Sequence, residues 1–351
     1  MQTDTLIVGG GLAGVALAAT LHAEGHDFQV LEARSRLGGR VHAARVDGAM
    51  FDLGPAWFWP HQPLMAAAAA RFGLTVFEQF SSGDIVAQDV QGQVRRGVGF
   101  ASMAGSLRIS GGMTALVAAY AQDLPQSAVH LDQEVLTVSQ QSGGVRVTTP
   151  TQEFTAKRVV LAIPPRIAAQ VRFDPALSAD QMHAMRVIPT WMAGHAKYLA
   201  IYDTPHWRDA GLSGDSQSRQ GPMVEVHDAS PATGGPYALF GFVGVDATTR
   251  AAHPTQMTQM AKDQLIQLFG PDMATPRALI LQDWAQDRHT ATQADRISGA
   301  HPDYGRPAAL THIWDGAVML GSSEMGMTHG GYLEGALEAA QDVAHRVISA
   351  R

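Results

Sequence analysis

A short glycine pattern near the N-terminus constrains this chain more than any other feature. Gly9, Gly11 and Gly14 follow an apolar stretch at residues 5–8. They open an alanine-rich, helix-like stretch at residues 12–23. In a strand–turn–helix unit, such glycines permit the tight turn, the close approach of backbone to a diphosphate, and close packing of helix on sheet. The free N–H groups at the start of the helix then face the phosphates. The pattern predicts a Rossmann-type unit that binds a dinucleotide.

An acidic residue supports this prediction. Residues 28–32 form a second strand-like stretch that ends in Glu32, where a carboxylate can accept hydrogen bonds from a ribose diol. The alternative is a purely structural glycine turn followed by a surface glutamate. The glycine pattern alone does not distinguish NAD from FAD.

Composition narrows the possible functions. The chain has 351 residues, of which 46% are hydrophobic and 16% charged, enough apolar material for about two globular domains. A net charge of −7 without any Lys/Arg cluster argues against nucleic acid as a partner. The absence of cysteine excludes disulfides, cysteine nucleophiles and thioether-linked cofactors. We find no secretory signal, transmembrane segment or histidine pattern typical of a metal site. We therefore expect a soluble, cytoplasmic protein without a bound metal.

The segment after the second strand carries a more specific pattern. Residues 32–40, with the sequence EARSRLGGR, resemble the E-A-R-x-R-x-G-G-R segment of the flavin-containing amine oxidase superfamily. Gly39 and its neighbour allow backbone to approach the diphosphate, and Arg40 supplies a forked cationic donor. The resemblance implies that Arg34 also binds the cofactor. The alternative for Arg34 and Arg36 is ordinary solvated charge.

The resemblance continues in order to the C-terminus. Residues 52–57 resemble the D-x-G-x-x-W segment of the family, which places Trp57 beside the flavin. Residues 129–165 resemble its strand unit, in which the backbone at Val135 receives the adenine. Glu324 belongs to a segment that resembles the T-E motif. Residues 331–336 resemble G-Y-x-E-G-A, and there Leu333 begins a helix aimed at the isoalloxazine ring. Together these segments imply FAD rather than NAD.

A lysine in the middle of the chain is the main catalytic candidate. Residues 195–202 resemble the family segment with the active-site lysine, which implies that Lys197 holds a water near flavin N5 and assists the reaction with oxygen. Strand alternation places Lys197 on the same face as Leu199 and Ile201, an apolar setting that indicates partial burial. The alternative is a lysine that extends into solvent from a strand edge.

Other positions match the family only in part. Tyr332 matches one of the two aromatic residues that flank the substrate amine, and Trp284 matches the D/N-W element. Ala294 stands where the second aromatic residue is expected, and Gln293 where some members carry the flavin-linking cysteine. We therefore expect that the flavin is not covalently attached and that only one of the two aromatic residues that flank the amine is present. The short segment at residues 52–111 predicts a more open entrance, or one that a partner covers.

We expect an α/β protein, with a Rossmann-type FAD-binding domain interleaved with a mixed α+β substrate domain. The boundaries that we predict are 1–62, 104–170 and 312–351 for the FAD-binding domain, and 63–103 and 171–311 for the substrate domain.

The expected reaction moves a hydride from an amine-bearing carbon to flavin N5. The imine product is hydrolysed, and oxygen or another acceptor reoxidises the flavin, with hydrogen peroxide released in the case of oxygen. The alternatives are a flavin dehydrogenase or desaturase that acts on a non-amine, an NAD-linked dehydrogenase, and a non-catalytic FAD-binding scaffold. The sequence does not define the substrate or the oligomeric state.

Overall fold

The N-terminal segment forms the predicted β-α-β unit. The computed structural model describes residues 1–297 and 299–349. In this structure β1 (Gln2–Val8) leads into α1 (Leu12–Ala23) and then into β2 (Phe28–Leu31), and the two strands pair in parallel. The apolar residues of β1 alternate between two core clusters on opposite faces of the sheet, with Ile7 on one side and Leu6 and Val8 on the other. Burial on both faces is typical of parallel strands.

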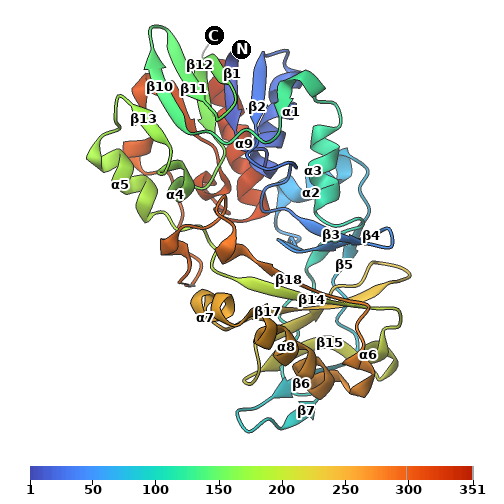
Figure 1. Cartoon of the computed structure of the whole chain (residues 1–351). Helices are drawn as coiled ribbons and strands as arrows, with labels where there is room; N and C mark the ends of the chain where they lie inside the picture. Colours follow the sequence, from blue (N-terminus) through green and yellow to red (C-terminus); the bar gives the residue numbers. More distant parts are fainter. Residues whose placement is uncertain (298, 350–351) are drawn as a thin grey trace.

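β1 lies inside an eight-stranded sheet that both ends of the chain help to build. The strand order is β13-β10-β11-β12-β1-β2-β9, and β19 pairs with β12 outside this path. Helices α1 and α9 pack on one face and α5 on the other. In Figure 1 the N-terminal and C-terminal segments lie together in this upper part of the molecule. The other elements of this region are α3 (Thr114–Ala121), β9 (Val129–His130), β10 (Thr137–Gln141), β11 (Gly144–Thr148), β12 (Glu153–Leu161), α4 (Pro165–Ala168), β13 (Arg172–Asp174), α5 (Ala179–Val187), β19 (Val318–Leu320) and α9 (Leu333–Ser349).

A second, seven-stranded sheet occupies the other end of the molecule (Figure 1). Its strand order is β18-β14-β17-β16-β15-β6-β7, so β14 is an interior strand. Helix α8 packs on the face that carries Tyr198 and Leu239, and the opposite face carries Leu199 and Phe240. The elements are β6 (Asp84–Gln88), β7 (Val94–Arg96), β14 (Ala196–Tyr202), α6 (His206–Asp209), β15 (Leu212–Ser218), β16 (Met223–Asp228), β17 (Tyr237–Val243), α7 (Ala247–Ala252), α8 (Pro254–Phe269) and β18 (Ala278–Asp283).

Short elements lie between the two sheets. They are β3 (Ala43–Val46), β4 (Ala49–Asp52), α2 (Pro63–Arg71), β5 (Val76–Glu78) and β8 (Leu107–Ile109). β3 pairs with β4, and β5 with β8. The fold is therefore of the predicted α/β class, with a Rossmann-type unit in the first sheet. Among the residues that the structure describes, no helix is both long and apolar enough to cross a membrane.

Candidate active site

The glycine pattern forms a tight cradle at the start of α1. A Cβ atom added at Gly14 would lie 1.9 Å from the Gly9 carbonyl oxygen, so only glycine fits at that position. Gly11 forms an isolated β-bridge with Gly38, and a Cβ at Gly39 would lie 3.3 Å from the Gly11 Cα. Helix α1 begins without a side-chain cap, which leaves its first N–H groups available to an anion. These features fit the diphosphate of a dinucleotide.

Glu32 is buried at the end of β2, with 3% of its surface exposed. Its carboxylate accepts hydrogen bonds from the backbone N–H groups of Gly10 at 2.8 Å and Arg34 at 2.9 Å. Glu32 is therefore not a surface residue, and the alternative considered above is excluded. A carboxylate has about four acceptor positions, so this oriented group retains capacity for ribose hydroxyls. The backbone that leads to Val135 lies next to Glu32, because the Gln133 N–H group donates to the Glu32 carbonyl oxygen at 2.8 Å. Val135 itself lies just before β10 and packs in the core.

Arg34 and Arg36 could each bind the cofactor or be solvated charge, judged from the sequence. In the structure both side chains form hydrogen bonds with other residues of the protein. Arg34 donates to Asp287 at 2.7 Å and to Thr290 at 3.0 Å, which joins the dinucleotide-binding segment to a loop after β18. Arg36 donates to backbone carbonyls, among them that of Gly39 at 3.0 Å. Neither side chain is simply solvated charge.

Arg40 and Glu324 come from opposite ends of the chain and form an ion pair. The Arg40 guanidinium contacts both carboxylate oxygens, at 2.7 and 3.2 Å, and also donates to Ser323 at 3.1 Å. The Glu324 side chain is fully buried. Burial alone would raise the pKa of Glu324, but Arg40 outweighs it and holds that pKa below its usual value. Burial likewise lowers the pKa of Arg40, but Glu324 outweighs it and raises that pKa. Both groups are therefore charged at neutral pH.

Lys197 is buried in the interior strand β14, with 4% of its surface exposed. Its Nζ donates to the Gly54 carbonyl at 2.7 Å and to the Asp52 carbonyl at 3.4 Å, and lies 4.1 Å from the Phe240 ring centroid. The predicted burial is confirmed, and a lysine that reaches solvent from a strand edge is excluded. Burial lowers the pKa of Lys197 to about 8. Burial also raises the pKa of the neighbouring Asp52 to about 6.

Two predicted tryptophans flank the same backbone segment. Trp284 Nε1 donates to the Leu53 carbonyl at 3.1 Å, and its ring lies 3.5 Å from the position that a Cβ at Gly54 would take. Trp57 donates to Gln79 at 2.8 Å and packs on Phe240 with a centroid separation of 5.1 Å. Lys197 and Trp284 therefore both bind backbone carbonyls of residues 52–54, and Trp57 follows in the same segment.

Tyr332 belongs to a second aromatic group. Its ring lies 4.9 Å from Trp191 in an edge-on arrangement and stacks on His301 at 4.8 Å. Sequence analysis missed Trp191 and His301, because both lie outside the recognised segments, and their only signal was aromatic character. Leu333, the first residue of α9, is buried in the core against α1.

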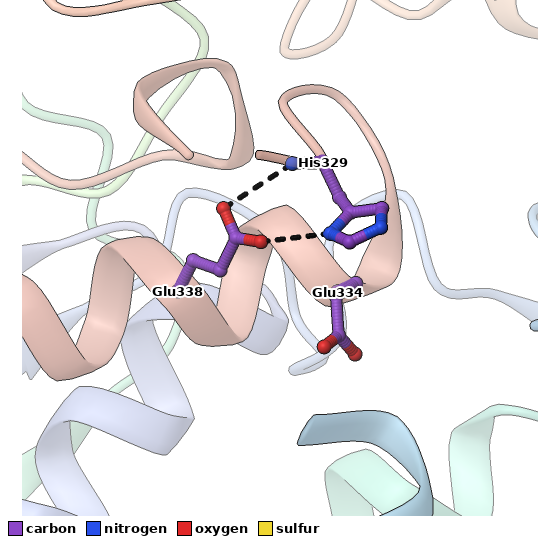
Figure 2. Close-up of side chains that lie close together, drawn as sticks. All are labelled: His329, Glu334 and Glu338. Carbon is purple, nitrogen blue, oxygen red and sulfur yellow. Dashed lines mark hydrogen bonds and ion pairs between the residues drawn. The ribbon is translucent and has the colours of Figure 1, made fainter. Parts of the chain in front are cut away.

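His329, Glu334 and Glu338 gather at the start of α9 and in the loop before it (Figure 2). Their potential ligand atoms lie within 4.8 Å of one another. Glu338 accepts from His329 Nδ1 at 2.9 Å and from the backbone N–H of Thr328 at 2.9 Å. Glu334 accepts the N–H groups of Leu64 and Met65, each at 2.8 Å, at the start of α2. Glu338 therefore fixes the loop that precedes Tyr332, and Glu334 ties α9 to α2.

Comparison with known proteins identifies a family. The family described as "Flavin containing amine oxidoreductase" matches residues 12–99 and 92–348. A putative flavin-containing monoamine oxidase, AofH, of Mycobacterium tuberculosis is 24% identical, over 99% of this chain and 96% of its own length. Putrescine oxidase of Kocuria rosea is 25% identical, over 69% of this chain and 73% of its own.

Two solved structures share the fold. A putrescine oxidase bound to putrescine superposes with a TM-score of 0.84 at 20% identity, covering 99% of both chains. Cyclohexylamine oxidase from Brevibacterium oxydans gives a TM-score of 0.84 at 19% identity, again over 99% of both chains. The chain is thus an oxidoreductase with a flavin cofactor, and it belongs to the flavin-containing amine oxidoreductase family.

Proposed function

We propose that this protein oxidises an amine with a non-covalently bound FAD. The observation that carries the proposal is the buried Lys197 ammonium, which is held at the Gly54 carbonyl and over the Phe240 ring on which Trp57 packs. When bound, FAD would accept a hydride from the carbon next to the amine nitrogen. An imine would result, water would hydrolyse it, and oxygen would take the two electrons and two protons as hydrogen peroxide.

The residues of the first sheet would hold the cofactor. The uncapped start of α1 and the glycine cradle suit the diphosphate, and Glu32 suits the ribose hydroxyls. Arg34 and Arg40 would act on the cofactor through the segments that they fix, since both guanidinium groups are paired with carboxylates. The start of α9, next to Tyr332, supplies the positive end of a helix dipole.

Residues of the 52–57 segment, their neighbours and the aromatic group at Tyr332 would serve the substrate. Tyr332, Trp57 and Trp284 provide aromatic surfaces that exclude water and orient an amine. Lys197 would hold a water at its ammonium and stabilise negative charge that passes to oxygen. We propose that residues 1–62, 104–170 and 312–351 bind the cofactor, and that residues 63–103 and 171–311 bind substrate. The two sheets support this division except at β13 and α5, which lie within residues 171–311 but pack on the cofactor side.

Non-covalent attachment is supported by the absence of cysteine and by Gln293 at the expected linkage position. Acid precipitation should leave the yellow colour in the supernatant. Colour that stays with the denatured pellet would contradict this part of the proposal.

The amine assignment is tested by anaerobic reduction of the purified flavoprotein with a panel of amines, amino acids and alcohols. An amine should bleach the flavin, and air should restore the colour with one peroxide formed per amine oxidised. Bleaching by a non-amine alone would indicate a dehydrogenase or desaturase of the same family. A flavin that no member of the panel reduces would favour a scaffold role.

A further inference from the structure

The segment that receives Lys197 also carries a buried carboxyl group, that of Asp52. Asp52 is the last residue of β4 and is 4% exposed. Its backbone carbonyl accepts from Lys197 Nζ at 3.4 Å, and its side-chain Oδ1 accepts from the backbone N–H group of Met113 at 2.9 Å. The reaction proposed above gives this carboxyl group no role.

The Asp52 side chain is closely confined. A Cβ atom added at Gly112, just before α3, would lie 2.8 Å from Asp52 Oδ1. The neighbouring Gly54 is also confined, because a Cβ there would lie 2.0 Å from the Arg40 carbonyl oxygen. Lys197 binds the carbonyls of both Asp52 and Gly54, so the carboxyl group is held in a fixed place relative to the ammonium.

A second buried cation lies in the same region. Arg108, on β8, is 5% exposed and donates to the backbone carbonyls of Ala229 at 3.0 Å and Ser230 at 2.8 Å. The hydrogen bonds of Lys197 likewise end on backbone carbonyls, which carry no net charge. Buried charges need an opposite charge close by, and these hydrogen bonds do not provide one.

The buried carboxylate of Asp228 is already matched by another cation. Asp228 is fully buried and accepts a bidentate pair of hydrogen bonds from Arg208, at 2.7 and 2.9 Å. It also accepts from Trp207 Nε1 at 2.8 Å. Asp52 is therefore the carboxyl group that balances the two remaining cations, Lys197 and Arg108.

The charged groups that face Lys197 act on it in opposite directions. Burial lowers the pKa of Lys197 to about 8, and within that balance Asp52 raises the pKa and Arg108 lowers it. Burial raises the pKa of Asp52 to about 6, against the opposing effects of Arg108 and Lys197. Phe242 and Gln282, which pair with Lys197 from the two neighbouring strands, carry no charge.

Loss of the carboxylate would leave two buried cations without a counter-charge. A guanidinium keeps its proton in proteins, whereas a buried ammonium readily loses it, so the lysine is the group that would respond. We propose that Asp52 is a positioning residue that acts through Lys197, because its buried carboxylate is the counter-charge that keeps the Lys197 ammonium protonated at neutral pH. Only its consequence for flavin reoxidation rests on the proposed function.

The protonation of Lys197 can be measured directly, since the chain contains three lysines, Lys157, Lys197 and Lys262. NMR of the holoenzyme with ¹³C-labelled lysine gives one Cε signal for each, and Lys197→Met identifies the signal of interest. Asp52→Asn keeps the acceptor for the Met113 N–H group but removes the charge. The titration midpoint of Lys197 should fall by at least about one pH unit, a tenfold change in its protonation equilibrium.

An exposed aspartate provides the matched control. Asp123→Asn, beyond the end of α3, makes the same change in net charge and should leave the Lys197 midpoint where it is. A midpoint that is unchanged in Asp52→Asn would overturn the inference.

The wild type supplies a test that does not depend on the folding of a variant. Because Asp52 becomes protonated near pH 6, the Lys197 signal should show a second, smaller inflection there, below its own titration near pH 8. The inflection should be absent from Asp52→Asn. A wild-type signal that titrates in a single step would show that the two groups do not interact, and would overturn the inference.

Stopped-flow reoxidation separates this inference from the proposed function. If the neutral lysine supports reoxidation tenfold more slowly, reduced Asp52→Asn should reoxidise about threefold more slowly than the wild type at pH 8, and the difference should close toward pH 6. Asp52→Asn should add nothing in the Lys197→Met background. A shifted NMR midpoint with unchanged reoxidation would support Asp52 as the counter-charge and contradict the role of Lys197 with oxygen. An unshifted midpoint would overturn this inference alone.

Discussion

The two sheets differ in how their functional residues are encoded. In the first sheet, Gly9, Gly14 and Glu32 lie close together in sequence and act through the backbone of one turn and one helix. In the second, Lys197 and Trp284 belong to separate segments of the chain and meet the backbone of residues 52–54 only in the folded protein. On the proposed function, cofactor binding is a local property of the chain, whereas the substrate surface is a property of the assembled sheet. Changes in the first sheet should therefore remove flavin, and changes in the second should alter chemistry while flavin stays bound.

The largest effect is expected from Gly14→Ala. The new Cβ would lie 1.9 Å from the Gly9 carbonyl oxygen, so the backbone of the cradle must move. We expect nearly complete loss of flavin, measured as the ratio of flavin to protein absorbance. Gly305→Ala adds the same methyl group where no atom lies within 4 Å and should keep full occupancy. A Gly14→Ala variant that purifies with a full complement of flavin would show that the cradle does not contact the cofactor.

A smaller loss is expected from Glu32→Ala. Removing a charged acceptor from buried donors costs on the order of 1.5–3 kcal/mol, which is a tenfold or greater loss in FAD affinity. Flavin retained after dialysis measures this, with the exposed Glu153→Ala as the control. Circular dichroism should show the same fold in both variants. Unchanged flavin retention in Glu32→Ala would show that Glu32 holds the turn at Gly10 but does not bind the cofactor.

The smallest effect is a pH dependence of flavin reoxidation in the wild type. Lys197 has a pKa lowered to about 8, so it is mostly charged at pH 7 and mostly neutral at pH 9. If the neutral form supports reoxidation tenfold more slowly, the rate should fall about fivefold between these pH values. The rate should decrease, not increase, as pH rises, because deprotonation removes the cation. A profile in Lys197→Met as steep as that of the wild type would assign the titration to another group.

Sequence reasoning succeeded where function depends on local pattern. The β-α-β unit, the burial of Lys197 and the α/β class all follow from spacing and alternation within short segments. It gave no access to pairings such as Arg34 with Asp287, because nothing local links residues separated by most of the chain.

The substrate side was least predictable. Trp191 and His301 meet Tyr332 through loops, and Lys197 and Trp284 meet residues 52–54 through the packing of separate segments. Periodicity assigns each of these residues to a strand face or to a loop, but it does not say which strands become neighbours. The lack of an aromatic residue at Ala294 was visible in the sequence, whereas the presence of other aromatic side chains beside Tyr332 required the fold.

We propose that Lys197 acts on the chemistry of the bound flavin and not on its retention. Lys197→Met keeps the length and apolar packing but removes the charge and the donors. After anaerobic reduction, the variant should carry normal flavin and reoxidise in stopped-flow mixing with oxygen at least tenfold more slowly, equivalent to about 1.4 kcal/mol of barrier. The reduction step should change less. Lys157→Met, at an exposed position on β12, should behave like the wild type. Reoxidation of Lys197→Met at the wild-type rate would contradict the account and make Lys197 a structural residue of β14.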